Sequence, residues 1–267
     1  YGFHNTHPVD AMYRNQGFEW GQPKDLDLAA CCERWAQLPL VFQPGTEWNY
    51  GISTDVLGRI VEVVSGLDLE EYFQQHILGP LGMTDTSFYI DDAGRKSRLA
   101  ELYIPHPETG VASIAPASLR RPERPSMLSG GAGLYGTAAD YMRFCQMILN
   151  GGALDAERVI GRHTLDYMGK NHLPGNVDLE AIGRPLFAES AFVGVGFGLG
   201  FSVVIDAATS KVPSSTGEMA WGGAASTAFW VDQAEDLAVV FLTQLLPSST
   251  HAIRPELKQL VYQALVD

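Results

Sequence analysis

The chain has 267 residues, 46% of them hydrophobic, which is enough for one large domain or two subdomains that share a core. Its 31 acidic and 18 basic residues give a net charge of −13, and this excludes a duplex-binding surface, which needs clustered Lys and Arg to neutralise phosphates. No apolar run approaches the roughly 18–20 residues of a membrane-spanning helix, so neither nucleic acid nor a membrane is expected as a partner.

The first half of the chain is predicted to alternate loops and helices. Residues 1–25 contain several glycines and prolines and are predicted to be loop. A short helix is expected over residues 27–37, and Pro39 ends it. Another helix is predicted over residues 69–78, and the turn formers of residues 84–135 favour long surface excursions.

The clearest helix lies between these two and starts just after Tyr50. Ser53 is predicted to cap its first turn, where Asp55 suits the helix dipole, and Gly66 supplies a left-handed stop. One apolar face is formed by Val56, Leu57, Ile60, Val61 and Val64.

The second half opens with helices and closes with strands. Thr137 is predicted to cap a helix over residues 138–150, and a shorter helix is expected over residues 158–168. From residue 194 to residue 201, glycines alternate with apolar residues, and this period of two predicts a strand rather than a phosphate-binding loop. Further strands over residues 218–231 and 237–244 and a terminal helix over residues 255–266 follow.

Three successive strands on short connectors predict an antiparallel sheet with a helix against one face. The predicted fold class is α/β of the α+β type, with an antiparallel sheet flanked by helices plus a helical subdomain. Residues 1–135 are predicted to be a mainly helical and loop region that carries Tyr50. Residues 136–267 are predicted to supply the returning helices, the strands and the terminal helix of the same domain.

The three cysteines, Cys31, Cys32 and Cys145, have neither the even count of a disulfide framework nor the spacing of a zinc site. They are interpreted as reduced thiols, with Cys145 in the core, and this favours a cytoplasmic setting. His4 and His7 fit a surface loop better than a metal site. No metal and no organic cofactor is expected.

Four segments resemble, in order, the motifs of one family. They are PGTEWNYGISTDVLG at residues 44–58, PLGMTDT at residues 80–86, SGGAGL at residues 129–134, and Trp221-Gly222-Gly223. Together they resemble family VIII carboxylesterases, which are relatives of class C β-lactamases and penicillin-binding proteins. The resemblance implies a β-lactamase-like fold. The tryptophan that leads Trp221-Gly222-Gly223 resembles the esterase branch of the family.

The resemblance also implies acyl transfer through a covalent serine ester. A serine hydroxyl needs a base, and the family uses lysine and tyrosine for this purpose, so Tyr50 is the predicted general base. Taken alone, Tyr50 would sooner be a core tyrosine with a structural hydrogen bond; the four motifs together favour the catalytic role.

The Trp221-Gly222-Gly223 motif has a geometric task in this mechanism. The tetrahedral oxyanion needs preorganised N–H donors, and the resemblance assigns one to the backbone of Ala224. Gly222 and Gly223 would let a substrate lie against the strand edge, and Trp221 would form a pocket wall. The alternative is a glycine bulge in an ordinary strand.

Ile52 departs from the lactamase pattern, which has asparagine two residues after the tyrosine. An apolar Ile52 and an aromatic Trp221 suit a small-molecule ester with a hydrophobic group. The leading interpretation is therefore a serine hydrolase of short-chain esters. The rivals are a β-lactamase or D-Ala-D-Ala peptidase, a non-catalytic binding module of the same fold, and acyl transfer to another acceptor.

The family's nucleophile motif is the element that this sequence lacks. No serine has lysine three residues later, whereas the resemblance places Ser-x-x-Lys before the tyrosine region. We therefore expect that the chain begins partway into its catalytic domain, lacks the first sheet strands and is inactive as it stands. The open sheet edge would then require self-association or a complementing N-terminal segment.

Overall fold

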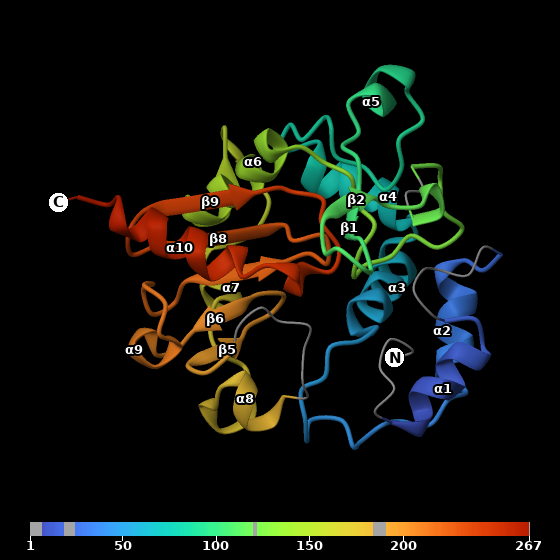
Figure 1. The fold of residues 1–267 in the computed structure, drawn as a ribbon, viewed down its shortest axis with the longest axis horizontal. Coiled ribbons are helices and arrows are strands. Elements are labelled where there is room, and N and C mark those ends of the chain that lie inside the picture. Colours follow the sequence, from blue (N-terminus) through green and yellow to red (C-terminus); the bar gives the residue numbers. More distant parts are fainter. Residues whose placement is uncertain (1–6, 19–24, 120–121, 184–190, 267) are drawn as a thin grey trace. The chain divides into compact units, whose positions relative to one another are not determined.

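The computed structural model describes residues 7–18, 25–119, 122–183 and 191–266 (Figure 1). They form two compact units, each described by itself below: residues 1–97 with 122–136, and residues 98–121 with 137–267. Within the described ranges, no helix has both the length and the apolar character needed to cross a membrane.

The first unit is built from helices. They are α1 (Pro8–Asn15), α2 (Leu28–Ala36), α3 (Ser53–Ser65), α4 (Leu69–Phe73), the π-helical turn η1 (Gln74–Leu78) and α5 (Ala93–Ser97). The helices predicted over residues 27–37 and 69–78 are confirmed as α2 and as α4 continued by η1.

The prediction of loop for residues 1–25 is wrong at α1. His7 begins this helix with a capping box, because its Nδ1 accepts from the N–H of Val9 at 3.2 Å and its own N–H donates to Asp10 at 3.2 Å. Pro8 occupies the first helical position, where its missing N–H costs nothing. This assigns His7 a capping role, while His4 lies outside the described residues.

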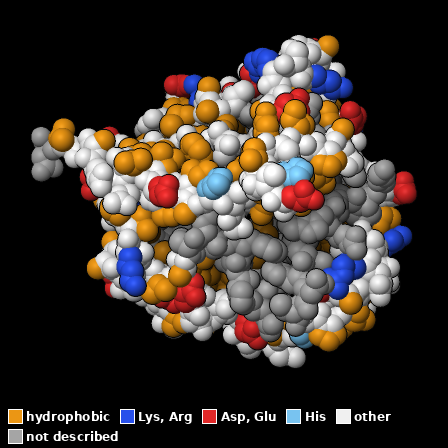
Figure 2. Space-filling view, in the orientation of Figure 1, with side chains coloured by type: hydrophobic (Ala, Val, Ile, Leu, Met, Phe, Trp, Pro, Cys, Tyr) orange, Lys and Arg blue, Asp and Glu red, His pale blue; other side chains and the backbone are white. Residues whose placement is uncertain are grey.

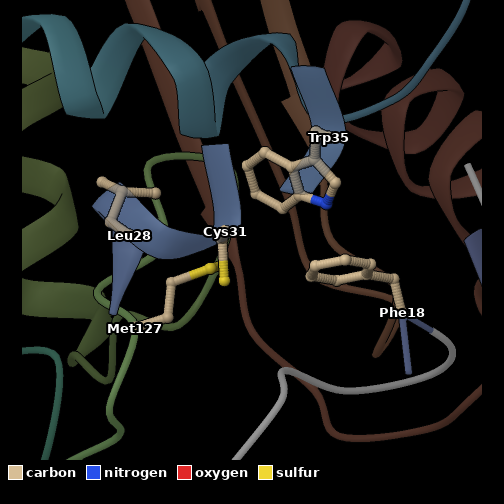
Figure 3. Packing of buried hydrophobic residues seen from close by; sticks show 5 residues of the cluster. All are labelled: Phe18, Leu28, Cys31, Trp35 and Met127. Carbon is tan, nitrogen blue, oxygen red and sulfur yellow. The ribbon is translucent and has the colours of Figure 1, made fainter. Parts of the chain in front are cut away.

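One side of α2 carries one of the core clusters of this unit. Cys31 is fully buried and Trp35 nearly so, and they pack with Leu28, Phe18 and Met127 (Figure 3). The rings of Trp35 and Phe18 lie 5.3 Å apart between centroids. Burial raises the pKa of the Cys31 thiol to about 11, so this cysteine stays protonated at neutral pH.

The cap predicted for α3 is wrong. The helix begins at Ser53, its N-cap is Ile52, and no side chain caps it. Of the predicted apolar face, only Val61 packs in a core cluster; the other four residues are exposed (Val56 38%, Leu57 57%, Ile60 52% and Val64 82%). The buried side of α3 instead carries Asp55 and Gly58, because a glycine lets another backbone come close.

The second unit contains a five-stranded antiparallel sheet in the order β5-β6-β7-β8-β9. Its strands are β5 (Val195–Phe197), β6 (Ser202–Val204), β7 (Met219–Gly222), β8 (Ala228–Asp232) and β9 (Leu237–Phe241). Two small hairpins accompany it, namely β1 (Tyr103–Pro105) with β2 (Ala112–Ile114) and β3 (Ala153–Leu154) with β4 (Glu157–Arg158).

The helices of this unit are α6 (Ala138–Leu149), α7 (Arg162–Met168), α8 (Leu179–Ile182), α9 (Ala207–Ser210), α10 (Ile253–Gln263) and the short 3-10 turns η2 (Ala117–Leu119), η3 (Pro174–Asn176) and η4 (Ser248–Thr250). The predicted cap of α6 is confirmed, since the Thr137 hydroxyl accepts from the N–H of Asp140 at 3.2 Å. Cys145 on this helix is fully buried, as predicted.

The antiparallel sheet is confirmed, but two of its predicted strands are hairpins. Residues 194–205 form β5 and β6, with a turn at Gly200, whose φ is +100°. Residues 218–231 form most of β7 and β8, joined by a turn over residues 223–227 that we call the β7–β8 turn. The sheet therefore has five strands where the sequence predicted three.

The two long helices of the second unit cover opposite faces of the sheet. On β8, the ring of Phe229 lies 5.1 Å from that of Tyr141 on α6, whereas Asp232 is hydrogen-bonded by Tyr262 on α10. Successive strand residues point to opposite faces, so odd-numbered residues of β8 face α6 and even-numbered ones face α10. Figure 1 shows α10 (red) running along the sheet.

A buried charged network fixes α10 to the sheet. Glu218 and Asp232 are each 1% exposed, and the Tyr262 hydroxyl lies 2.8 Å from Glu218 and 2.5 Å from Asp232. Lys258 donates to Glu218 at 2.5 Å. Burial raises the pKa of Glu218, and Lys258 opposes this shift. Glu218 thus depends on side-chain donors from α10, whereas Asp232 also accepts from the backbone N–H groups of Ser215, Ala234 and Glu235.

The sheet ends at β9, which has only β8 as a neighbouring strand among the described residues. Hydrophobic side chains are exposed over β9 and α10 (Figure 2), with Leu242 44%, Leu260 64% and Leu265 42% accessible. Self-association or a complementing segment along this edge stays a prediction.

Candidate active site

Tyr50 lies in the loop just before α3 and is half-buried. Burial and, secondarily, the negative charge of Asp55 raise the pKa of its phenol. The described surroundings therefore keep Tyr50 neutral at pH 7. To act as a base, this tyrosine needs a cation close by that lowers its pKa, which is the task that the family resemblance gives to a lysine.

Asp55 joins the start of α3 to the SGGAGL motif at residues 129–134. Asp55 is 4% exposed, and its carboxylate accepts a short hydrogen bond from the Ser129 hydroxyl and a longer one, 3.3 Å, from the N–H of Gly131. Ser129 in turn accepts from the N–H of Ala132 at 3.0 Å. The sequence suggested only a favourable dipole for Asp55 and missed this contact, because its partner lies 74 residues away.

The glycines of this motif are required by close backbone packing. A Cβ on Gly130 would lie 2.2 Å from the carbonyl oxygen of Thr54, and the Cα of Gly130 lies 3.5 Å from a Cβ built on Gly58. The first turns of α3, which start three residues after Tyr50, and the loop at residues 129–131 are therefore packed backbone against backbone.

Replacing Asp55 with asparagine is expected to lower the pKa of Tyr50, because a negative charge beside the phenol disfavours phenolate and the substitution removes it. Asparagine keeps an oxygen that can accept from Ser129, so the fold should persist. The measurement is a titration of ¹³Cζ-labelled tyrosines by NMR, with Tyr50→Phe to assign the signal. An unchanged Tyr50 titration in Asp55→Asn would contradict the electrostatic coupling.

Ile52 serves the core of the first unit. It is half-buried, forms the N-cap of α3 and packs against the cluster that contains Phe18 and Trp35. This gives Ile52 a packing role; its predicted contact with substrate stays a prediction.

Trp221 and Gly222 point to opposite faces of the sheet. Trp221 pairs with Phe229, so it lies on the α6 face, where its ring packs against Phe197 (5.4 Å between centroids) and Phe192 (6.2 Å). Gly222 lies on the other face, toward α10. The tryptophan is therefore part of an aromatic cluster, and its use as a pocket wall stays a prediction.

The spaces beside the two glycines of Trp221-Gly222-Gly223 are already filled by side chains of the second unit. A Cβ on Gly222 would lie 2.4 Å from the guanidinium carbon of Arg254, and a Cβ on Gly223 would lie 2.4 Å from the Thr227 hydroxyl. A side chain at either position would have to displace the Arg254 guanidinium or the Thr227 hydroxyl, and the expectation that these glycines leave room for a substrate stays a prediction. Sequence reasoning missed Arg254, which is 32 positions beyond Gly222.

Ala224 is the first central residue of the β7–β8 turn, and not a strand residue as predicted. The turn is closed by hydrogen bonds from Gly223 N–H to Thr227 at 3.0 Å and from Ser226 N–H to Gly223 at 3.1 Å. Ala224 is exposed, and among the described residues its N–H has no hydrogen-bond acceptor. An exposed N–H at a fixed position is the feature that an oxyanion donor requires.

Tyr50 belongs to the first unit and the residues from Trp221 to Ala224 belong to the second. Within the described residues, no group of three or more His, Cys, Asp and Glu side chains is placed to hold a metal ion. The first unit offers the neutral phenol of Tyr50, and the second offers the backbone N–H of Ala224.

This fold and these motifs define a known class. The chain belongs to the beta-lactamase family, whose sequence model matches residues 5–263. The predicted β-lactamase-like fold of mixed helices and antiparallel sheet is confirmed.

Among the relatives of the chain, Protein Rv1367c of Mycobacterium tuberculosis is 35% identical over 258 residues, which are 92% of this chain and 59% of that protein. Esterase EstB of Burkholderia gladioli is 31% identical over 232 residues, 82% of this chain and 55% of the esterase. The chain thus spans less than two thirds of the length of these curated relatives.

The structure is also similar to solved structures. EstCE1, described as a hydrolase with promiscuous acyltransferase activity, superimposes with a TM-score of 0.74 at 25% identity, covering 95% of this chain and 66% of EstCE1. Simvastatin synthase from Aspergillus terreus gives a TM-score of 0.76 at 22% identity over 100% of this chain and 67% of that chain, a likeness of fold.

Proposed function

We propose that the protein containing this chain is a serine carboxylesterase that cleaves short-chain esters through an acyl-enzyme. The observation that carries the proposal is the N–H of the exposed residue Ala224, which has no acceptor among the described residues and lies in a closed turn directly after Trp221-Gly222-Gly223. The relationship to Esterase EstB supports ester substrates.

The reaction proceeds in two balanced halves. A serine Oγ attacks the ester carbonyl carbon while its proton passes to Tyr50, and the oxyanion accepts a hydrogen bond from Ala224 N–H. When the intermediate collapses, the bond to the alcohol breaks and Tyr50 returns the proton to the leaving oxygen. Water then attacks the acyl carbon while its proton passes to Tyr50, and the bond to the serine Oγ breaks as Tyr50 returns the proton to this oxygen, which releases the carboxylic acid.

The nucleophile in this proposal is a Ser-x-x-Lys serine of the full-length protein, because none of the serines of this chain has lysine three residues later. The lysine supplies the cation that Tyr50 requires. The charge of Asp55 cannot do this, because it raises the pKa of the phenol.

The test is the intact mass of the full-length protein before and after a fluorophosphonate, together with turnover of p-nitrophenyl butyrate and a chromogenic cephalosporin. One adduct per chain with ester turnover in excess of cephalosporin turnover is the expected result. Cephalosporin turnover at a comparable rate would favour a β-lactamase. A protein with neither adduct nor turnover would be a binding module of the same fold.

Acyl transfer to an alcohol or amine acceptor is a second candidate, favoured by the acyltransferase activity in the description of EstCE1. It uses the same acyl-enzyme and differs only in what attacks it. Product analysis with an added alcohol separates the two, because a transferase yields the new ester and a hydrolase yields the acid.

A further inference from the structure

One side chain of α10 holds the β7–β8 turn from outside. The Arg254 guanidinium donates from Nη2 to the carbonyl oxygens of Gly223 at 2.6 Å and Thr227 at 2.9 Å, and from Nε to Thr227 at 3.2 Å. These three hydrogen bonds join the two ends of the turn that contains Ala224. A planar guanidinium with several fixed donors suits such a task better than an ammonium group.

The carbonyl of Gly223 and the N–H of Ala224 belong to the same peptide group. A trans peptide is planar, so its C=O and N–H point in opposite directions and move together. By fixing the Gly223 oxygen on one side, Arg254 fixes the direction of the Ala224 N–H on the other. The same oxygen also accepts from Ser226 N–H at 3.1 Å, so the peptide is held at two points.

The cation also changes the strength of this donor. A positive charge on a carbonyl oxygen draws electron density from the amide nitrogen and makes its N–H a better hydrogen-bond donor. Ala224 N–H therefore points away from Arg254 as a polarised donor without an acceptor among the described residues.

Gly222 makes this arrangement sterically possible. Its missing side chain is the space that the guanidinium occupies, because a Cβ there would lie 2.4 Å from Cζ and 2.6 Å from Nη2 of Arg254. Residue 222 faces α10 by the alternation of β7, which is the side from which Arg254 enters.

We propose that Arg254 is a positioning residue for the oxyanion site, which aims and polarises the N–H of Ala224 through the Gly223–Ala224 peptide. The proposal rests on the proposed function, because it assigns this N–H to the oxyanion of an ester intermediate. Arg254 acts through the peptide and not by contact with the substrate.

The test compares Arg254→Lys with Arg158→Lys in the full-length protein. Arg158 is a matched control, since its guanidinium also donates to two backbone carbonyls, those of Gly151 and Ile160, both at 3.2 Å, on the β3–β4 hairpin. Loss of a complete oxyanion donor lowers kcat by about 10²–10³, so a misdirected donor is expected to lower it by about tenfold to hundredfold. KM should change much less, and Arg158→Lys should leave both constants unchanged.

Two further measurements separate positioning from general loss of structure. Added methylguanidinium should restore part of the kcat of Arg254→Ala. Gly222→Ala should lower kcat as Arg254→Lys does, and the double variant should be no worse than either single one, because both disturb the same contact. Thermal unfolding and circular dichroism of each variant identify any that has lost its fold.

The two proposals fail differently. A folded wild-type protein without ester turnover and without a fluorophosphonate adduct overturns the proposed function. A wild-type protein that turns over esters, with Arg254→Lys retaining kcat within twofold, overturns the role of Arg254 and leaves the proposed function standing. A fall in kcat that is equal in Arg254→Lys and Arg158→Lys also overturns the role of Arg254.

Discussion

Replacing Tyr50 with phenylalanine in the full-length protein is expected to lower kcat/KM for a short-chain ester by a factor of about 10²–10⁴. The substitution removes the oxygen that takes the proton of the serine and returns it to the leaving alcohol. The aromatic ring remains, so the half-buried position before α3 keeps its packing. Steady-state kinetics on p-nitrophenyl butyrate is the measurement.

Tyr13→Phe is the matched control for this substitution. Tyr13 also lies in the first unit, and burial and a neighbouring aspartate, Asp10, raise its pKa as they do that of Tyr50. It packs edge-on against Phe18 in the core, 6.3 Å between ring centroids. We expect Tyr13→Phe to retain the activity of the wild type. Equal activity of Tyr50→Phe and the wild type would remove Tyr50 from the mechanism.

The second large effect is expected in stability, from Lys258→Met. Glu218 is almost completely buried, and the side chain of Lys258 is 17% exposed. Removing the lysine leaves a buried carboxylate with the Tyr262 hydroxyl as its remaining described side-chain donor. Breaking a buried ion pair in this way typically costs about 3–5 kcal/mol, and we expect the free energy of unfolding at pH 7 to fall by that amount.

The control for this variant is Arg143→Met. The ion pair of Arg143 with Asp155 has the same length, 2.5 Å, but its side chains are 38% and 65% exposed. Solvent screens such a pair, so its loss should cost at most about 1 kcal/mol. Urea denaturation of both variants and of the wild type gives the comparison. Losses of the same size in the two variants would show that burial of Glu218 is not the cause.

The pH dependence of the free energy of unfolding of Lys258→Met further tests whether the buried charge of Glu218 causes the loss of stability. Burial raises the pKa of Glu218 and Lys258 lowers it, so removal of the lysine raises this pKa further. A carboxyl whose pKa is higher in the folded state than in the unfolded state binds its proton preferentially when folded, so its stability cost disappears as the pH falls below the folded pKa. The deficit of Lys258→Met relative to the wild type should therefore shrink as the pH is lowered from neutrality.

Local rules predicted much of this fold and failed where distant residues decide. The Thr137 cap, the α2 and α4 helices and the antiparallel pairing follow from neighbouring residues, and the motifs in order led to the family. The hairpin at residues 223–227 was missed because a glycine pair inside an apolar run fits a continuous strand as well as a turn. Periodicity alone does not separate the two.

The apolar stripe of α3 shows a different limit. Apolar residues three and four positions apart indicate which side of a helix is hydrophobic, but Asp55 and Gly58 are the residues buried within the unit. Their burial depends on Ser129 and Gly130, which the chain brings back more than 70 positions later. Likewise, the contact between Gly222 and Arg254 appears only once α10 packs on the sheet.

The seat that Gly222 provides for Arg254 changes what the Trp-Gly-Gly signature means in other genomes. A descendant that lost its nucleophile would still need a bare position beside the arginine, because a side chain there would displace the guanidinium that holds the β7–β8 turn. Selection for folding alone would then preserve the signature long after selection for activity had ended. The presence of Trp-Gly-Gly therefore indicates the fold, and only the nucleophile motif distinguishes an active enzyme from an inactive relative.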